Sequence, residues 1–291
     1  MDTNGSTALA NARVKATNLN ANVTLGATTN SSGVYSIALG TDPTIGDIIK
    51  LEVYKPTGPN FAISEHLVLA ATGSETAATI TTDKICYTNP SKVATFMGVT
   101  SLAFTMDSNP SVASVCQTIR RVETYLENVT QHAWRAVATP DYEFYDIKAF
   151  HLPQTGYQVK LLHRTVRTLT ALSGDVLEIW NGSSWEDWLA NYTEGRGNDY
   201  WLQPDSGILW LRSFNLVIRP RGIRIKYRYG ETTVPANVER VTTMLTIKDL
   251  LTFDDRSVLL PEGGSNPIDK LAKLDIEINK ITKSLTEWVP V

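Results

Sequence analysis

Cysteine and long apolar runs are scarce in this chain of 291 residues. Its two cysteines, Cys86 and Cys116, are too few for a disulfide framework, and neither belongs to a CxxC pair. Cys116 falls on the apolar stripe of an expected helix, which favours a buried, unreactive thiol over a bridge to Cys86. No apolar run approaches the roughly 18 residues of a membrane span, and residues 1–5 lack the features of a secretory signal. We therefore expect no membrane targeting.

Motifs for catalysis, cofactor binding and metal binding are also missing. The four histidines lie in different expected elements, and no HExxH, HxH or Cys/His cluster has the spacing of metal ligands. There is no Walker loop, GxGxxG or GxSxG pattern, and the glycine cluster at 195–197 lies between β segments rather than before a helix. The acidic pair Asp254-Asp255 is of a kind that is usually solvated. We therefore expect no metal, no cofactor and no enzymatic activity.

The net charge is −3, but parts of the chain differ in sign. Residues 206–230 carry six basic groups and no acid, whereas residues 231–291 carry seven basic and ten acidic groups. In the segment 223–229 apolar and basic residues alternate, so a strand there places Arg224, Lys226 and Arg228 on one face. A basic strand and an acidic helical end favour a charge-complementary contact between neighbouring subunits. The alternative is that the basic strand faces a polyanion.

Residues 1–84 are rich in Thr, Ala, Asn and Ser, with turn residues between short alternating segments. This pattern predicts a small β-sandwich with strands at 12–17, 23–28, 34–39, 48–54, 61–69 and 77–81. A turn that ends in Gly33 delivers Tyr35 and Ile37 to one face of the third strand.

Helices are expected at 89–135 and 235–288. Asn89-Pro90-Ser91 caps a short helix at 92–97, and Pro235 opens a later one with a broad apolar face around Val238, Val241, Leu245 and Leu250-Leu251. Two helices carry narrow stripes at heptad spacing, which is typical of helices that pack on other helices. The first stripe is Val112, Val115, Ile119, Val122, Leu126 and Val129, and the second is Leu271, Leu274, Ile278, Ile281, Leu285 and Trp288.

Residues 140–230 switch to the period-two alternation of strands. Asn181-Gly182 joins the hairpin strands 176–180 and 185–189, and the turn at 204–207 predicts another hairpin. Aromatic residues are dense here: Trp180, Trp185, Trp188, Tyr192, Tyr200, Trp201 and Trp210. Exposed, they would form a sugar-stacking platform; buried, they would form the core of a small β domain, which the pairing of Trp180 with Trp185 favours.

The expected fold class is α+β and multidomain. A β-sandwich at 1–84 is followed by a domain at 85–291, in which a helical bundle core is interrupted by the antiparallel β-rich insertion at 140–230. The stretch "ATTNSSGVYSI … GDIIKLEVYKPTG" resembles the carboxypeptidase-regulatory-like (transthyretin-like, immunoglobulin-type) domains. That resemblance implies an accessory binding or spacer module without catalytic residues.

Three stretches of residues 85–291 are distinctive: "CYTNPSKVATFMGV" with the helix ending "VTQHAWR", "VLEIWNGSSWEDW" with "PDSGILWL", and "IKYRYGETTVPANVERVTTMLTIKDLL". Together they resemble the head–tail connector (adaptor or head-completion) family of tailed phages and tailed archaeal viruses. The last block is the most specific, because a strand ending Tyr229-Gly230 is followed by a helix that Val234-Pro235 opens.

The resemblance implies a structural virion protein in the neck, assembled in the host cytoplasm. Such proteins form a homo-oligomeric ring, usually of twelve copies, which joins the portal protein to a tail-side neck or tail-terminator protein. Genomic DNA passes through the ring without sequence specificity. A C-terminal segment reaches into the portal, which makes Glu287, Trp288, Val289, Pro290 and Val291 the docking candidates, although Trp288 equally fits the end of the helix stripe. Arg224, Lys226 and Arg228 are candidates for the subunit or channel surface.

Two other functions are compatible with parts of the sequence. A carbohydrate-binding adhesin or tail protein would use the tryptophan-rich β region, but it has no use for helices with heptad stripes. A secreted glycan-active enzyme would need a carboxylate pair at a cleft. Glu186 and Asp187 are candidates for such a pair only as surface residues.

Overall fold

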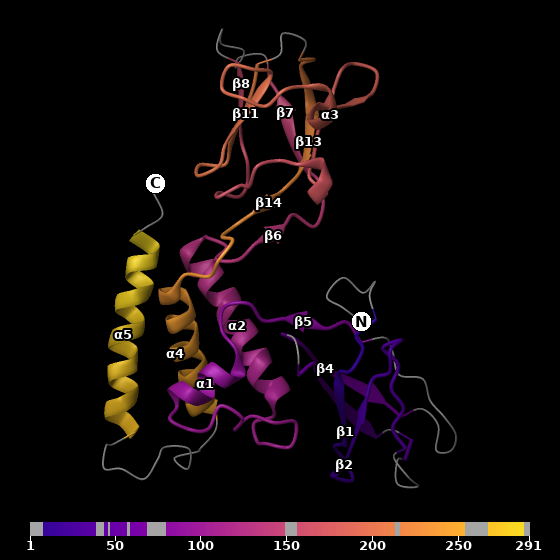
Figure 1. Cartoon of the computed structure of the whole chain (residues 1–291), viewed down its shortest axis with the longest axis vertical. Coiled ribbons are helices and arrows are strands. Elements are labelled where there is room, and N and C mark those ends of the chain that lie inside the picture. The colour runs from indigo at the N-terminus through magenta and orange to yellow at the C-terminus, as the bar shows by residue number, and fades with distance from the viewer. Residues whose placement is uncertain are drawn as a thin grey trace. The chain divides into compact units, whose positions relative to one another are not determined.

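The computed structural model describes residues 8–38, 44–45, 47–56, 59–68, 80–148, 156–212, 216–253 and 267–287. The chain forms two compact units, Met1–Thr130 with Pro235–Val291, and Gln131–Val234 (Figure 1). We call them the mixed unit and the β unit. Helices and several antiparallel sheets make the protein α+β, as the sequence predicted.

The sheet of the mixed unit has the strand order β2-β1-β3-β4-β5 and is antiparallel throughout. Its strands are β1 (Arg13–Asn18), β2 (Val23–Thr28), β3 (Ile48–Tyr54), β4 (Asn60–Leu67) and β5 (Asp83–Lys84). Four predicted strands are therefore confirmed with small shifts of their ends. Residues 34–38 and 80–81 form no strand, and residues 39 and 77–79 of those two predicted strands lie outside the described residues.

The two faces of this sheet are covered by different parts of the chain. On one face, buried residues of β1, β3 and β4 pack against Tyr35, Ile37 and Ile80. On the other face, Tyr54 and Phe61 join the core around helix α2 (Val112–Thr130). Because the sheet packs against α2, the compact units do not divide at residue 84, where the sequence suggested a domain boundary. Within the described residues this region holds one sheet and not the two of a sandwich.

Helix α2 buries the stripe predicted from its heptad spacing. Val112, Val115, Ile119, Val122 and Leu126 are buried, whereas Val129 is 39% exposed. The helix ends at Thr130 and Gln131 has a φ of 51°, so the predicted continuation to residue 135 is wrong. Helix α1 (Pro90–Phe96) begins after Asn89, whose side chain accepts a hydrogen bond from the Lys92 backbone N–H at 2.9 Å, as expected of an N-cap.

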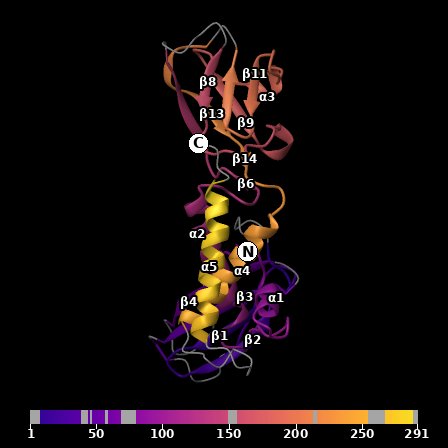
Figure 2. The same ribbon diagram turned by 90° about the vertical axis from the view of Figure 1, so that its left-hand side faces the viewer.

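Helix α4 (Ala236–Phe253) contacts α1, α2 and α5 (Pro267–Glu287) in the mixed unit, and Figures 1 and 2 show α5 beside it. Its buried residues are Val238, Val241, Met244 and Ile247, together with Thr242, Thr243 and Thr246. The Thr242 hydroxyl donates to the Val238 carbonyl at 2.7 Å, which satisfies it inside the core. Since α4 has neighbours on several sides, its burial spreads beyond the face predicted around Leu245. None of the helices described has the length and apolar character needed to cross a membrane.

The β unit contains three sheets, with orders β10-β9-β13-β7, β11-β12-β8 and β14-β6. The pairing of both predicted hairpins is confirmed, because β9 pairs with β10 and β11 with β12. The strand predicted at 185–189 is too long, because it ends at Asp187 and the next two residues are helical. The strands are β6 (Val137–Ala138), β7 (Glu143–Ile147), β8 (Tyr157–Lys160), β9 (Val176–Trp180), β10 (Trp185–Asp187), β11 (Tyr200–Gln203), β12 (Ile208–Leu211), β13 (Arg219–Lys226) and β14 (Arg228–Tyr229), with a short helix α3 (Trp188–Asn191).

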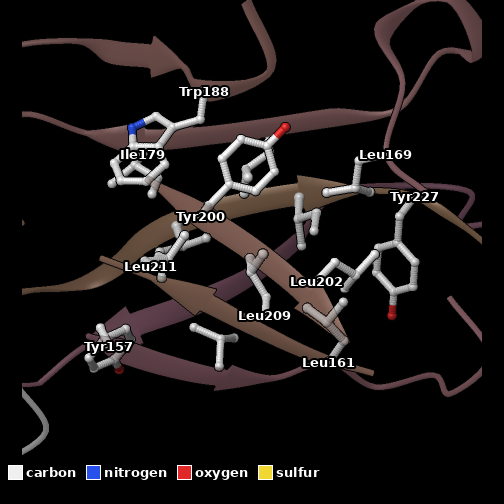
Figure 3. Close-up of a cluster of buried hydrophobic side chains, with 14 of the residues drawn as sticks. Tyr157, Leu161, Leu169, Ile179, Trp188, Tyr200, Leu202, Leu209, Leu211 and Tyr227 are labelled. Atoms are coloured by element: carbon white, nitrogen blue, oxygen red, sulfur yellow. The ribbon is translucent and has the colours of Figure 1, made fainter. Parts of the chain in front are cut away.

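The core of the β unit is formed by the four-stranded and three-stranded sheets (Figure 3). Leu209 and Leu211 of β12 are fully buried, and so are Ile223 and Ile225 of β13. Trp188 is buried among these aliphatic side chains, with the ring of Tyr192 stacked on it at 4.4 Å between centroids. The opposite face of the four-stranded sheet is therefore not part of this core.

Candidate interaction surface

The outer face of the four-stranded sheet follows from strand alternation. Alternate residues of β9 and β13 are buried, so Glu178, Trp180 and Arg224 lie on the opposite face. The register places Arg224 between Glu178 of β9 and Phe144 of β7. The hairpin turn pairs Trp185 with Trp180, and their ring centroids lie 5.7 Å apart.

Arg224 is the first of the basic residues singled out from the sequence. Its Nε donates to the Glu178 carboxylate, and this hydrogen bond raises the pKa of Arg224. The guanidinium carbon lies 4.5 Å from the ring centroid of Trp185 and 5.0 Å from that of Tyr142. Arg224 is thus neutralised by a cross-strand carboxylate and held between two aromatic rings.

Arg228 makes its contacts within the β unit. Its Nε and Nη2 donate to the buried Asp175 carboxylate at 2.9–3.2 Å, and Nη2 also donates to the Thr168 carbonyl. Asp175 in turn accepts from the Thr170 backbone N–H at 2.9 Å. Lys226 is half-buried, and no carboxylate of the described residues forms an ion pair with it. Whether these basic residues face another subunit or a channel stays a prediction.

Two further arginines, which the sequence pattern did not indicate, lie on this face. Arg219 and Arg221 are exposed at the start of β13, where the sequence pattern suggested no strand. The guanidinium carbon of Arg219 lies 4.5 Å from the ring centroid of Trp180, and that of Arg221 lies 3.9 Å from the centroid of Phe144. We call the resulting surface the arginine–aromatic face: Tyr142, Phe144, Trp180, Trp185, Arg219, Arg221 and Arg224. The only indication of this face in the sequence is the run of basic residues within 206–230.

The tryptophan cluster is divided between core and surface. Trp188 and Tyr200 are buried, which agrees with the core interpretation, whereas Trp180, Trp185, Trp201 and Trp210 are half-buried. Guanidinium groups lie over the rings of Trp180 and Trp185, and Arg196 lies 5.4 Å from the centroid of Trp201. A sugar ring stacks on an open aromatic face, so these contacts count against a carbohydrate platform.

A polar network surrounds Glu143 inside the β unit. Tyr145 donates to its carboxylate at 2.6 Å, Tyr227 donates at 3.0 Å, and His163 Nε2 lies 3.7 Å from it. Burial and the neighbouring carboxylate raise the pKa values of both tyrosines, and burial lowers the pKa of His163. The ring of His163 stacks on Tyr229 at 3.8 Å. Because the hydroxyls are held as donors to a carboxylate, the network is suited to fixing strands rather than to proton transfer.

The mixed unit contains an open groove of about 600 Å³ between β4, β5 and α2. Phe61 and Ile63 lie on one wall, and the other wall includes Arg120, which forms an ion pair with Asp83 at 3.1 Å. No three His, Cys, Asp or Glu side chains in the described part of the chain are grouped to hold a metal ion. Of the suggested carboxylate pair, Asp187 caps α3 by accepting from the Leu189 and Ala190 N–H groups.

The predicted portal-docking residues begin at the end of α5. Glu287 is the last residue of this helix, and 288–291 lie outside the described residues. On the described part of the predicted stripe, Ile278 and Leu285 are buried. Ion pairs connect the helix to α4, from Lys248 to Asp275 at 2.6 Å and from Arg240 to Glu277. The docking role therefore stays a prediction, on a helix that is held against α4.

Comparisons with known proteins give few matches. No protein-family model matches the chain, and no curated protein matches it. Among solved structures, the chain is similar to one described as "Neck of empty GTA particle computed with C6 symmetry", with a TM-score of 0.33 and 13% identity. The match covers 57% of this chain and 78% of that chain. A TM-score this low does not establish a common fold.

Proposed function

We propose that this protein is a structural component of a tailed-virus neck, a head–tail adaptor that forms a ring under the portal. The observation that carries the proposal is the third sequence block, which resembles the connector family at residues 225–251. In the structure this block runs from β13 through β14 into α4, which packs beside α2 and α5. The packing of α2, α4 and α5 on one another agrees with the helical bundle that the resemblance implies.

The proposed partners are the portal protein on the capsid side and a tail-side neck or tail-terminator protein. The ring has about twelve copies in this proposal, as the family resemblance implies, and genomic DNA passes through it without sequence-specific contacts. The end of α5 and residues 288–291 are proposed to dock into the portal, with Trp288 as the anchor. A single buried tryptophan commonly contributes a large share of an interface's binding free energy.

The proposed role involves no catalysis. The polar groups that would attract attention in an enzyme have structural partners here: Glu143 accepts from two tyrosines, and Asp175 binds Arg228. Asp47 accepts from Asn18 and from Thr44, and these hydrogen bonds lower its pKa. Satisfied carboxylates of this kind are typical of loop and strand anchoring.

The decisive experiment combines the full chain with the portal protein of the same virus. We expect a complex of defined mass by light scattering, and a ring coaxial with the portal by electron microscopy. Trp288→Ala should weaken portal binding by more than about tenfold. Ile276→Ala is the matched control, because Ile276 lies on the same helix and is 71% exposed. A chain that stays monomeric in the presence of the portal would contradict the proposal.

A further inference from the structure

The arginine–aromatic face carries chemistry that the fold of the β unit does not use. The hydrophobic core lies on the other side of the four-stranded sheet, yet Tyr142 and Phe144 are 40% and 38% exposed on this one. Their rings and those of Trp180 and Trp185 form a continuous surface, with neighbouring centroids 5.7–6.4 Å apart. Partly exposed aromatic side chains are among the residue types enriched in protein–protein interfaces.

The arginines of this face are pre-organised for an external acceptor. Arg219 lies over Trp180 and Arg221 over Phe144, and among the described residues neither guanidinium forms an ion pair with a carboxylate. A guanidinium stacked on a ring keeps the N–H groups at its edge available, in the geometry that matches a carboxylate. Because the stacked side chains are already ordered, less conformational entropy is lost when they bind.

The carboxylates on and beside this face are already engaged. Glu178 binds Arg224, Asp146 accepts from the Arg221 backbone N–H at 2.9 Å, and Asp187 caps α3. These acids therefore leave the side chains of Arg219 and Arg221 available. A partner that supplies carboxylates would complete the hydrogen bonding of both arginines.

The charge of the chain indicates which partner that is. The β unit has 12 basic and 11 acidic residues, net +1, whereas the mixed unit has 15 basic and 19 acidic residues, net −4. We infer that the arginine–aromatic face binds the acidic mixed unit of a second copy of this chain. This inference rests on the proposed ring, and a contact between unlike surfaces of successive copies is the type that closes into rings.

Three observations favour a protein over a nucleic acid as the occupant. Nucleic-acid bases stack on open aromatic faces, but guanidinium groups lie over Trp180, Trp185 and Phe144. Aromatic residues and arginine are also the residue types enriched in protein–protein interfaces, especially at their binding hot spots. The net charge of −3 gives the whole chain no general attraction for a polyanion.

The test compares charge reversals in the full chain, with the portal protein present. Arg219→Glu with Arg221→Glu should weaken subunit association by more than about tenfold, measured by sedimentation velocity. Lys160→Glu with Arg196→Glu is the matched control, because it makes the same charge change on exposed residues at another part of the β unit. Arg219→Lys with Arg221→Lys should give an intermediate loss, since charge remains but the planar fork does not.

Photo-crosslinking then identifies the occupant. With p-benzoylphenylalanine in place of Phe144, irradiation of the assembled protein should join this position to peptides from 1–130 or 235–291 of another copy. Crosslinks only to residues 131–234, to the portal, or to nucleic acid would overturn the inference. Rings that form normally with the double glutamate variant would also overturn it while leaving the proposed function intact. If the unmodified chain does not assemble in the presence of the portal protein, both the inference and the proposed function are contradicted.

Discussion

Glu123 offers the sharpest test of how the mixed unit is held together. This residue lies on α2 with its side chain fully buried, and its Oε1 accepts hydrogen bonds from two consecutive backbone N–H groups. The donors are Cys86 at 2.5 Å and Tyr87 at 2.6 Å. The carboxylate therefore fixes the segment between the sheet and α1 onto the middle of α2. We predict that Glu123→Ala destabilises the mixed unit strongly.

The magnitude follows from the two hydrogen bonds that the variant loses. A buried N–H that loses its acceptor costs about 1–3 kcal/mol. Because the Tyr87 N–H is buried and the Cys86 N–H is only half-buried, the two together cost roughly 2–4 kcal/mol. Arg120 also loses a contact of 3.3 Å to Glu123, but it keeps Asp83 at 3.1 Å, which limits that part of the loss. Glu123→Gln retains an oxygen for both N–H groups and should cost only about 1 kcal/mol.

Urea denaturation followed by two probes separates this effect from any change in the β unit. Of the seven tryptophans, all but Trp288 lie between residues 131 and 234, so fluorescence reports mainly on the β unit. The long helices α2, α4 and α5 belong to the mixed unit, so far-ultraviolet ellipticity reports mainly on it. With a urea slope of about 2 kcal/mol per molar, Glu123→Ala should lower the ellipticity midpoint by at least about 1 M. The fluorescence midpoint should stay nearly unchanged.

Two results would refute this reasoning. If Glu123→Ala lowers the free energy of unfolding by less than about 1 kcal/mol, the carboxylate is not the principal partner of the two N–H groups. If Glu123→Gln is as damaging as Glu123→Ala, the charge matters and the acceptor geometry does not. An equal shift of both probes would mean that the two units unfold together.

Three other residues give independent predictions. Asp175→Ala removes the carboxylate that pairs with Arg228, whose side chain is 27% exposed. The free energy of unfolding of the β unit should therefore fall by about 3 kcal/mol, measured by urea unfolding followed by fluorescence. An unchanged urea midpoint would contradict this ion pair. Burial holds the pKa of His163 below 6.5, so the unfolded state binds more protons and stability should fall as pH drops below 6.5. Replacing His163 by Gln should flatten that part of the stability profile, and an unchanged profile would show that another group is responsible. Burial raises the pKa of Cys116 to about 12. A thiol reagent should therefore modify half-buried Cys86 first and leave Cys116 unmodified until the protein unfolds. Mass spectrometry of the digested protein measures which cysteine is modified.

Local patterns predicted the elements whose own residues decide them. The apolar stripe of α2 could be predicted because its residues recur at regular spacing within one short segment. The hairpin at Asn181-Gly182 could be predicted because its turn residues lie directly between its two strands. The burial of α4 was harder to read. Neighbouring helices contact α4 on several sides, so Thr242 and Thr246 are buried as well as aliphatic residues. The alternation of apolar and polar residues that marks a helix with one buried face is therefore weak in its sequence.

The arginine–aromatic face could not be predicted, because it depends on strand register between distant segments. β7 and β13 are separated by more than two-thirds of the β unit, yet their pairing sets Phe144 beside Arg224. A register shift between Arg219 and Ile223 bends the ladder there, and Arg221 has a φ of 52°. The basic alternation at 223–229 is visible in the sequence, but the aromatic ring that each arginine contacts is not.

The Tyr229-Gly230 motif, which carried the resemblance most specifically, has a local structural reason. Gly230 has a φ of +83°, and a Cβ there would lie 2.8 Å from the Ala133 carbonyl oxygen, so only glycine fits. Its N–H donates to Thr165 at 2.9 Å, and the N–H of Glu231 donates to Ala133 at 3.2 Å. This glycine therefore secures the point where the chain leaves the β unit beside its own first residues. The motif therefore has a structural reason inside the β unit. In the proposed adaptor, the surfaces that recognise neighbouring proteins are the arginine–aromatic face and the end of α5.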